Sequence, residues 1–283
     1  MEYSIKKEAL QNDLLVETLQ ALSECYAALG EEVYVVGAAA RDIAMRLLNV
    51  GDTPRRTLDL DVAVALDDWN QYERLSQLLL RNHFVKAPEL QRFYFVGPQE
   101  KNQYEVDIVP FGEVEHNGMI AWPPEGSPVM SVRCFSEVMN HANKVTVEGE
   151  FSFRLASLSG QFLLKLDTWS DRHFKTRKDA SDMVYFLQNV YVAYALTREG
   201  LPREVDVEAR TFDITVAGAE WIAADLRTIL SPHNRQYYAA MLQEEVDKED
   251  ESLLLNDLLD VSDSRNYALF RRALTRISQI LES

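Results

Sequence analysis

The sequence has little cysteine, no long apolar run and fewer basic than acidic residues, and each shortage excludes a class of protein. Only Cys25 and Cys134 occur among the 283 residues, so we expect neither a disulfide framework nor a cysteine-based zinc site. No apolar run reaches the roughly 18 residues of a membrane-spanning helix. The charged N-terminus, MEYSIKKEALQNDLL, lacks the apolar core of a secretory signal. We therefore expect a cytoplasmic protein without a membrane partner.

The charge balance argues against a large nucleic-acid footprint. The chain has 29 basic and 45 acidic residues, a net charge of −16, whereas affinity for phosphate backbones comes from clustered Lys and Arg. A local basic site remains compatible with this composition. Many carboxylates gather between Gln243 and Ser264, a stretch that we interpret as the solvated face of a helical region.

Hydrophobic periodicity divides the chain into two parts. In the first part, alternating β-branched runs predict strands, and residues 92–97 and 103–112 read as an antiparallel hairpin. From about Ser157 onward, amphipathic helical patterns dominate. We therefore predict a domain with both strands and helices over residues 1–150, followed by a helical domain over residues 151–283.

Two carboxylates interrupt an otherwise apolar strand, LDLDVAVAL. Asp59 and Asp61 point to the same face, because side chains alternate along a strand. Both stay ionised only if a positive group lies between them. A hard divalent cation satisfies this condition, since Mg²⁺ prefers carboxylate oxygens together with substrate phosphates. The alternative is an edge strand on which both carboxylates face solvent.

A third carboxylate, Asp107, lies in the similar run YEVDIVPF, with Glu105 as a second-choice ligand on the same face. If this strand neighbours the first, Asp59, Asp61 and Asp107 form a cradle for two Mg²⁺ or Mn²⁺ ions. Such a cradle supports in-line displacement at phosphorus.

A glycine precedes this strand at a predicted strand-to-helix turn. Gly37 follows the run VYVV, and a helix is predicted to start directly after it, at Ala38. The exposed N–H groups and the dipole of a helix N-terminus suit a triphosphate, and glycine permits close approach to the backbone. Alone, such a turn is common and carries little weight.

Together, VVGAAARD, TLDLDVAV and VDIVPF resemble the signature of the nucleotidyltransferase superfamily related to DNA polymerase β. The Gly-x-x-x-Arg-Asp element is similar to the head of CCA-adding enzymes and poly(A) polymerases. The resemblance covers roughly residues 33–112 and implies a polymerase-β-like α+β fold, in which helices flank a mixed sheet. It also implies that Asp59, Asp61 and Asp107 bind two metal ions, with Asp107 helping to deprotonate an acceptor hydroxyl. It also suggests that Arg41 holds the triphosphate or orients the aspartate strand; otherwise Arg41 and Asp42 are an ordinary pair on a helix surface. Ala38 departs from the family's usual Gly or Ser.

A basic stretch, LLKLDTWSDRHFKTRKDASDMVYFL, stands out in this acidic chain. Lys165, Arg172 and Lys178 are candidates to bind the phosphates, whereas the alternative is a charged corner between helices with i,i+4 pairs such as Lys178 with Asp182. The stretch resembles the Lys, Arg and Lys-Asp-x-x-Asp pattern of abortive-infection type nucleotidyltransferase toxins. That resemblance implies an antitoxin partner and transfer to an acceptor such as transfer RNA.

These patterns predict a metal-dependent nucleotidyltransferase that moves a nucleoside monophosphate from a nucleoside triphosphate to an acceptor hydroxyl. The acceptor is open among RNA, protein and a small molecule. Two alternatives remain. One is an antibiotic-type adenylyltransferase, and the other is an inactive nucleotide-binding or interaction protein of the same fold, which Ala38 favours.

Overall fold

The computed structural model describes residues 1–50, 59–97, 103–197 and 200–283. The chain forms two compact units, one of Met1–Leu47 with Gly51–Ser157 and one of Leu48–Val50 with Leu158–Ser283. The predicted division after residue 150 falls just before a strand, β10 (Phe151–Leu155), that lies within the sheet of the first unit.

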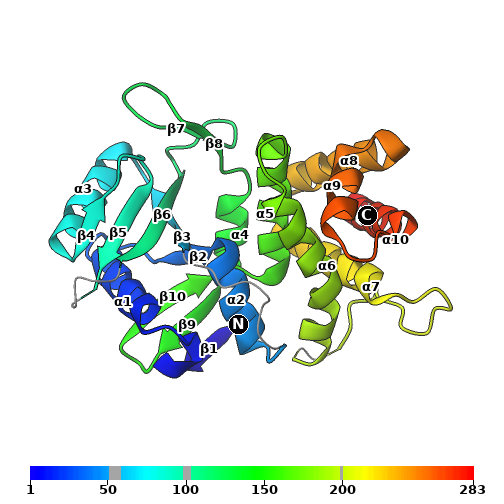
Figure 1. Ribbon diagram of the computed structural model, residues 1–283, viewed down its shortest axis with the longest axis horizontal. Helices are drawn as coiled ribbons and strands as arrows, with labels where there is room; N and C mark the ends of the chain where they lie inside the picture. The colour runs from blue at the N-terminus through cyan, green and yellow to red at the C-terminus, as the bar shows by residue number, and fades with distance from the viewer. Residues whose placement is uncertain (51–58, 98–102, 198–199) are drawn as a thin grey trace. The chain divides into compact units, whose positions relative to one another are not determined.

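The first unit is built on a mixed sheet of eight strands in the order β1-β9-β10-β2-β3-β6-β5-β4 (Figure 1). The pairs β1 with β9, β10 with β2, and β3 with β6 are parallel, whereas the other neighbouring pairs are antiparallel. A separate antiparallel pair joins β7 and β8. The strands are β1 (Glu2–Ile5), β2 (Tyr34–Val36), β3 (Asp59–Leu66), β4 (Phe84–Lys86), β5 (Arg92–Val96), β6 (Gln103–Gly112), β7 (Met119–Ala121), β8 (Val129–Ser131), β9 (Asn143–Val147) and β10.

Helices flank this sheet, which gives the unit its α+β character. Two of them begin at side-chain caps: Asn12 accepts a hydrogen bond from the Leu15 N–H before α1, and Asp68 accepts one from the Gln71 N–H before α3. Such caps satisfy N–H groups that have no partner within the helix. The helical segments are η1 (Lys7–Leu10), α1 (Asp13–Ala27), α2 (Gly37–Leu47), α3 (Trp69–Arg81) and α4 (Phe135–Asn140).

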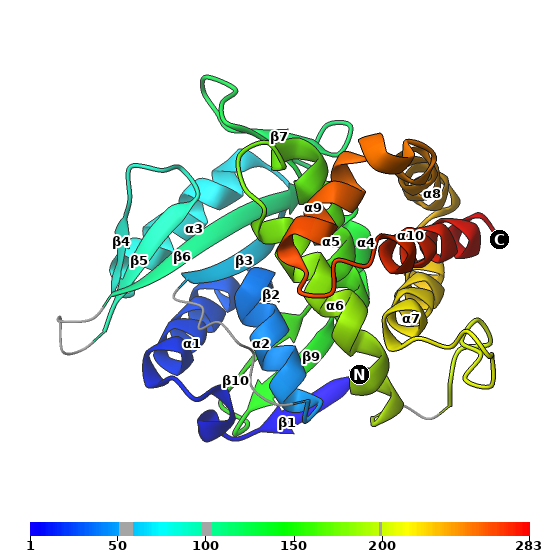
Figure 2. The ribbon, with the colours of Figure 1, turned by 45° about the vertical axis from the view of Figure 1, so that its right-hand side comes forward.

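The predicted hairpin of β5 and β6 is confirmed, and β6 then pairs in parallel with β3. Figure 2 shows β3, β6, β5 and β4 side by side. Leu60, Val62 and Val64 of β3 are fully buried, so this apolar face packs into the core. Alternation along the strand then places the intervening aspartates on the opposite face.

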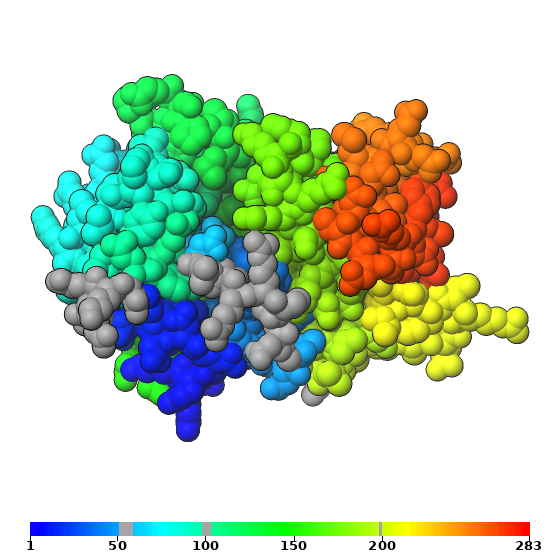
Figure 3. All heavy atoms as spheres, in the orientation of Figure 1, coloured from blue at the N-terminus to red at the C-terminus, as the bar shows by residue number. Residues whose placement is uncertain are grey.

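The second unit contains α5 (Leu158–Arg172), α6 (Lys178–Ala195), α7 (Ile214–Ile229), α8 (Pro232–Asp247), η2 (Glu249–Glu251), α9 (Leu253–Val261) and α10 (Tyr267–Glu282). None of the helices in the described part of the chain is both long and apolar enough to cross a membrane. The acidic stretch 243–264, orange in Figure 3, lies on α8, η2 and α9, where every carboxylate except those of Glu245 and Asp257 is exposed. It is the solvated helical face that the sequence predicts.

Candidate functional site

Strand register places two of the predicted carboxylates side by side. Asp61 of β3 is the direct register partner of Asp107 of β6, and Asp59 pairs in the same way with Glu105. Registered residues of neighbouring strands project to the same face, so all four carboxylates share one side of the sheet. Asp59 is exposed and the other three are half-buried. The face is therefore acidic and accessible to water.

The strand-to-helix turn at Gly37 contacts this acidic face. Val36 is the register partner of Asp61, so the chain turns into α2 directly beside that carboxylate. Gly37 has a φ of +67°, and a Cβ atom there would lie 2.1 Å from Asp61 Oδ2. Only glycine fits both constraints. The N-terminus of α2, with Ala38 as its second residue, thus begins next to Asp61.

A cation that the sequence did not single out lies on the same face. Arg92 opens β5 opposite Asp107 and donates Nε to Oδ1 and Nη2 to Oδ2 of that carboxylate, each at 2.8 Å. Its Nη2 is also 2.9 Å from Oε1 of Glu105. The available signal was a cation at the start of a strand whose hairpin partner carries Asp107. The sequence alone does not tell which residues of the two predicted strands pair with one another, because the residues between the strands contain no motif that fixes the turn.

Burial and local charges shift the pKa of groups around these carboxylates. The hydrogen bonds from Arg92 to Asp107 raise the pKa of the guanidinium. Burial lowers the pKa of Lys86 to about 8, against the opposing charge of Asp107. Burial, with the charges of Asp59 and Asp42, raises the pKa of Tyr104 to about 12. The negative potential of this region therefore reaches neighbouring strands.

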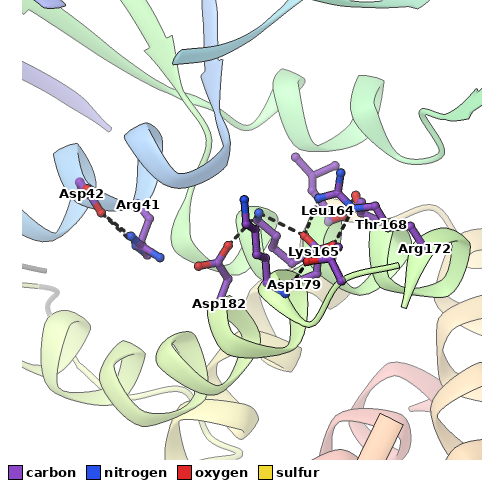
Figure 4. Close-up of polar contacts among 10 residues, drawn as sticks. Arg41, Asp42, Leu164, Lys165, Thr168, Arg172, Asp179 and Asp182 are labelled. Atoms are coloured by element: carbon purple, nitrogen blue, oxygen red, sulfur yellow. Dashed lines mark hydrogen bonds and ion pairs between the residues drawn. The ribbon is translucent and has the colours of Figure 1, made fainter. Parts of the chain in front are cut away.

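Arg41 and Asp42 are buried rather than on a helix surface. They are 7% and 6% exposed, and Arg41 donates Nε and Nη2 to Oδ1 of Asp42 at 3.0 and 2.8 Å (Figure 4). A charged pair at this depth persists because the partners satisfy one another. The interaction between them is structural, and phosphate binding by Arg41 stays a prediction.

The basic stretch of the second unit forms an ion-pair network between α5 and α6 (Figure 4). Asp179 is fully buried. Arg172 donates hydrogen bonds from Nε and Nη2 to the Asp179 carboxylate at 2.7 and 2.9 Å. Lys165 Nζ lies 3.3 Å from Oδ1 of the same carboxylate. Lys165 also pairs with Asp182 at 2.7 Å, whereas Lys178 is exposed at the start of α6. Triphosphate binding by Lys165, Arg172 and Lys178 stays a prediction.

This network keeps Asp179 ionised despite its burial. Burial alone raises the pKa of such a carboxyl, but hydrogen bonds from Arg172 and the charge of Lys165 outweigh it, so the pKa of Asp179 lies below its ordinary value. These ion pairs fix α5 and α6 relative to one another.

The acidic face of the first unit brings two of the predicted metal ligands, Asp61 and Asp107, into direct register. Among the residues that the structure describes, no three carboxylate, imidazole or thiolate groups lie close enough to hold one metal ion. Mg²⁺ needs only one or two carboxylates when substrate phosphates supply further oxygens, and Mn²⁺ accepts the same ligands. Asp61 and Asp107 are two such carboxylates, and metal binding by them stays a prediction. The participation of Asp59 in a three-carboxylate, two-metal cradle stays a prediction.

Comparison with known proteins adds little to this geometry. No family model and no curated protein matches the sequence. Among solved structures, the chain is similar to a CCA-adding enzyme of Thermotoga maritima in a complex with tRNA, at 11% identity and a TM-score of 0.33. That alignment covers 94% of this chain and 68% of the other. Similarity at this level shows neither a shared family nor a shared activity.

Proposed function

We propose that this chain is a nucleotidyltransferase that moves a nucleoside monophosphate from a nucleoside triphosphate to an acceptor hydroxyl, with Mg²⁺ or Mn²⁺ as cofactor. The observation that carries the proposal is the direct register of Asp61 with Asp107, beside a glycine turn that the Asp61 carboxylate itself requires. Two carboxylates and a helix N-terminus at one point provide ligands for a cation and for phosphate oxygens.

The proposed division of labour follows from position. Asp61 and Asp107 would hold the cation, which lowers the charge on the phosphates and activates the attacking oxygen. The N–H groups at the start of α2 would donate hydrogen bonds to the oxygens of the triphosphate, close to Asp61. Asp107 would take the proton of the acceptor hydroxyl. That oxygen forms a bond to the α-phosphorus, the bond from the α-phosphorus to the bridging oxygen breaks, and pyrophosphate leaves.

A second candidate, an inactive nucleotide-binding protein of the same fold, is favoured by one observation. Both oxygens of Asp107 are already engaged by Arg92, and a carboxylate held in this way contributes nothing to catalysis until it is released. The more specific role of a toxin that modifies transfer RNA, paired with an antitoxin, rests on the motif around Lys165 alone. An adenylyltransferase for small molecules shares the same chemistry.

Transfer of labelled nucleotide tests the proposal. Purified protein is incubated with each α-labelled nucleoside triphosphate, Mg²⁺ or Mn²⁺, and separate RNA, protein and small-molecule fractions. We expect label in one fraction, and a loss of roughly 100-fold or more in Asp61→Asn, because cation stabilisation of the transferring phosphate is worth several kcal/mol.

The matched control is Asp13→Asn, which changes an exposed carboxylate at the start of α1 and leaves transfer unchanged. Incorporation into no fraction, with triphosphate binding that resists chelation of the metal, would instead favour the inactive binding protein. The fraction that takes the label identifies the acceptor class.

A further inference from the structure

Arg92 occupies both oxygens of Asp107, the carboxylate that the proposed chemistry needs for cation binding and proton transfer. Both carboxylate oxygens accept a hydrogen bond from the guanidinium, each at 2.8 Å. This planar, two-point arrangement is the strongest geometry that arginine offers a carboxylate. The same Nη2 contacts Glu105 at 2.9 Å. Arg92 therefore forms ion pairs with two of the four carboxylates on this face.

A divalent cation and this guanidinium compete for the same oxygens. Each Asp107 oxygen has lone pairs beyond the one that Arg92 uses, but a cation bound there would lie within a few ångströms of a fixed positive charge, and that repulsion is strong at short range. Direct coordination by Asp107 therefore requires Arg92 to move away. In the absence of a cation, Arg92 offsets the mutual repulsion of the neighbouring carboxylates.

The exposure of the pair makes such an exchange feasible. The side chains of Arg92 and Asp107 are 26% and 19% exposed, so water reaches both partners when they separate. Partly exposed ion pairs are weak compared with buried ones, because solvent replaces the lost contacts. Arg41 and Asp42, at 8% side-chain exposure each, lack this freedom.

We propose that Arg92 is a latch on the metal site: it holds Asp107 in the metal-free protein and is displaced when a divalent cation binds. The inference rests on the proposed nucleotidyltransferase function and deepens it. Arg92 is a positioning residue, because it determines the cation concentration at which Asp107 exchanges the guanidinium for the metal ion. At low cation concentration, Arg92 stays bound to Asp107.

Binding of Mn²⁺ without nucleotide tests the latch without any activity measurement. The free Mn²⁺ signal in electron paramagnetic resonance is titrated with the full chain and with Arg92→Gln. We expect Arg92→Gln to bind Mn²⁺ up to about fivefold more tightly, the size expected for the loss of one partly exposed charged pair. Arg92→Lys keeps the charge but loses the two-point contact, so its gain is smaller, and it serves in place of Arg92→Gln should that variant fail to fold.

The matched control is Arg154→Gln. Arg154 lies on β10 of the same sheet, pairs with Glu32 at 2.9 Å, and is 32% exposed, so its loss removes a comparable pair away from the acidic face. Adding Asp107→Asn to Arg92→Gln must cancel the gain. Equal affinity in the wild type and both Arg92 variants would overturn the latch and leave the proposed function intact. Failure of all of them to bind Mn²⁺, with and without triphosphate, would overturn the latch and the metal-dependent function together.

Discussion

At the scale of single residues, the contact between Gly37 and Asp61 ties backbone geometry to the site. The left-handed φ of +67° and the 2.1 Å approach of a hypothetical Cβ to Asp61 Oδ2 act independently. The first constrains the turn into α2, and the second keeps the carboxylate against that turn. A side chain at position 37 would therefore disturb both the turn and the position of the Asp61 carboxylate beside Asp107.

Gly37→Ala should lower the free energy of unfolding by about 3 kcal/mol. About 1 kcal/mol comes from placing alanine in a left-handed conformation, and the remainder from displacing the Asp61 carboxylate, which is overpacking at a tight contact. Chemical denaturation followed by circular dichroism measures the difference.

Gly149→Ala is the control for that experiment. Gly149 has a similar φ of +74° but nothing within 4 Å of its hypothetical Cβ, so its loss should be about 1 kcal/mol. Equal losses in the two variants would show that Asp61 does not press on the turn.

Residue-level features of the site were readable from sequence only where a local rule applied. The shared face of Asp59 and Asp61 followed from the two-residue period of a strand. Arg92 was missed because its pairing depends on the register between β5 and β6, and one residue of slip would turn its side chain to the other face. The burial of Arg41 was missed because hydrophobic pattern alone assigns charged residues to the surface.

At the scale of elements, α5 and α6 are joined by the buried carboxylate of Asp179. Its contacts come from Lys165 and Arg172 of α5, while it belongs to the first turn of α6. This arrangement gives Lys165 and Arg172 a structural role, because these two cations keep one buried carboxylate ionised.

Asp179→Asn should destabilise the protein by about 2 to 3 kcal/mol at pH 7, somewhat less than for a wholly buried pair because the Arg172 side chain is 46% exposed. The pKa of Asp179 is lowered in the folded protein, so its contribution is fully present above the unfolded-state pKa of about 4. That contribution disappears as the pH falls through the lower folded-state value.

Thermal melting of both proteins from pH 7 to pH 3 measures this effect. The difference in melting temperature should be constant near neutrality and narrow below about pH 4. Asp171→Asn, an exposed carboxylate on α5, serves as the control with no difference at any pH. A difference between wild type and Asp179→Asn that persists undiminished at low pH would mean that ionisation of Asp179 is not what stabilises the junction.

Elements with strong local patterns were predicted correctly, and those that depend on distant partners were not. The hairpin of β5 and β6 and the helices from Leu158 onward show clear periodicity. The strand β1 was missed because it pairs with β9 more than a hundred residues away. The short β4 was missed because three residues carry too little pattern. The predicted division after residue 150 lies just before β10, which pairs with β9 and β2.

At the scale of the whole molecule, the chain combines an α+β unit with a unit in which helices are the regular elements of the described residues. The net charge of −16 is spread over both, with a dense exposed band on α8, η2 and α9. Such a field repels polyanions at long range, so an acceptor or triphosphate must be drawn in by local groups or by a cation. The acidic face around Asp61 and Asp107 is a place where a cation changes the local charge most.

Anomalous diffraction from Mn²⁺ is the sharpest test of cation binding by Asp61 and Asp107. Crystals are grown with Mn²⁺ and a triphosphate analogue whose α–β bridge cannot break. We predict an anomalous peak about 2.1 Å from oxygens of both Asp61 and Asp107, with Arg92 moved off Asp107. A structure with the analogue bound, no manganese between these two carboxylates and Arg92 still gripping Asp107 would contradict it.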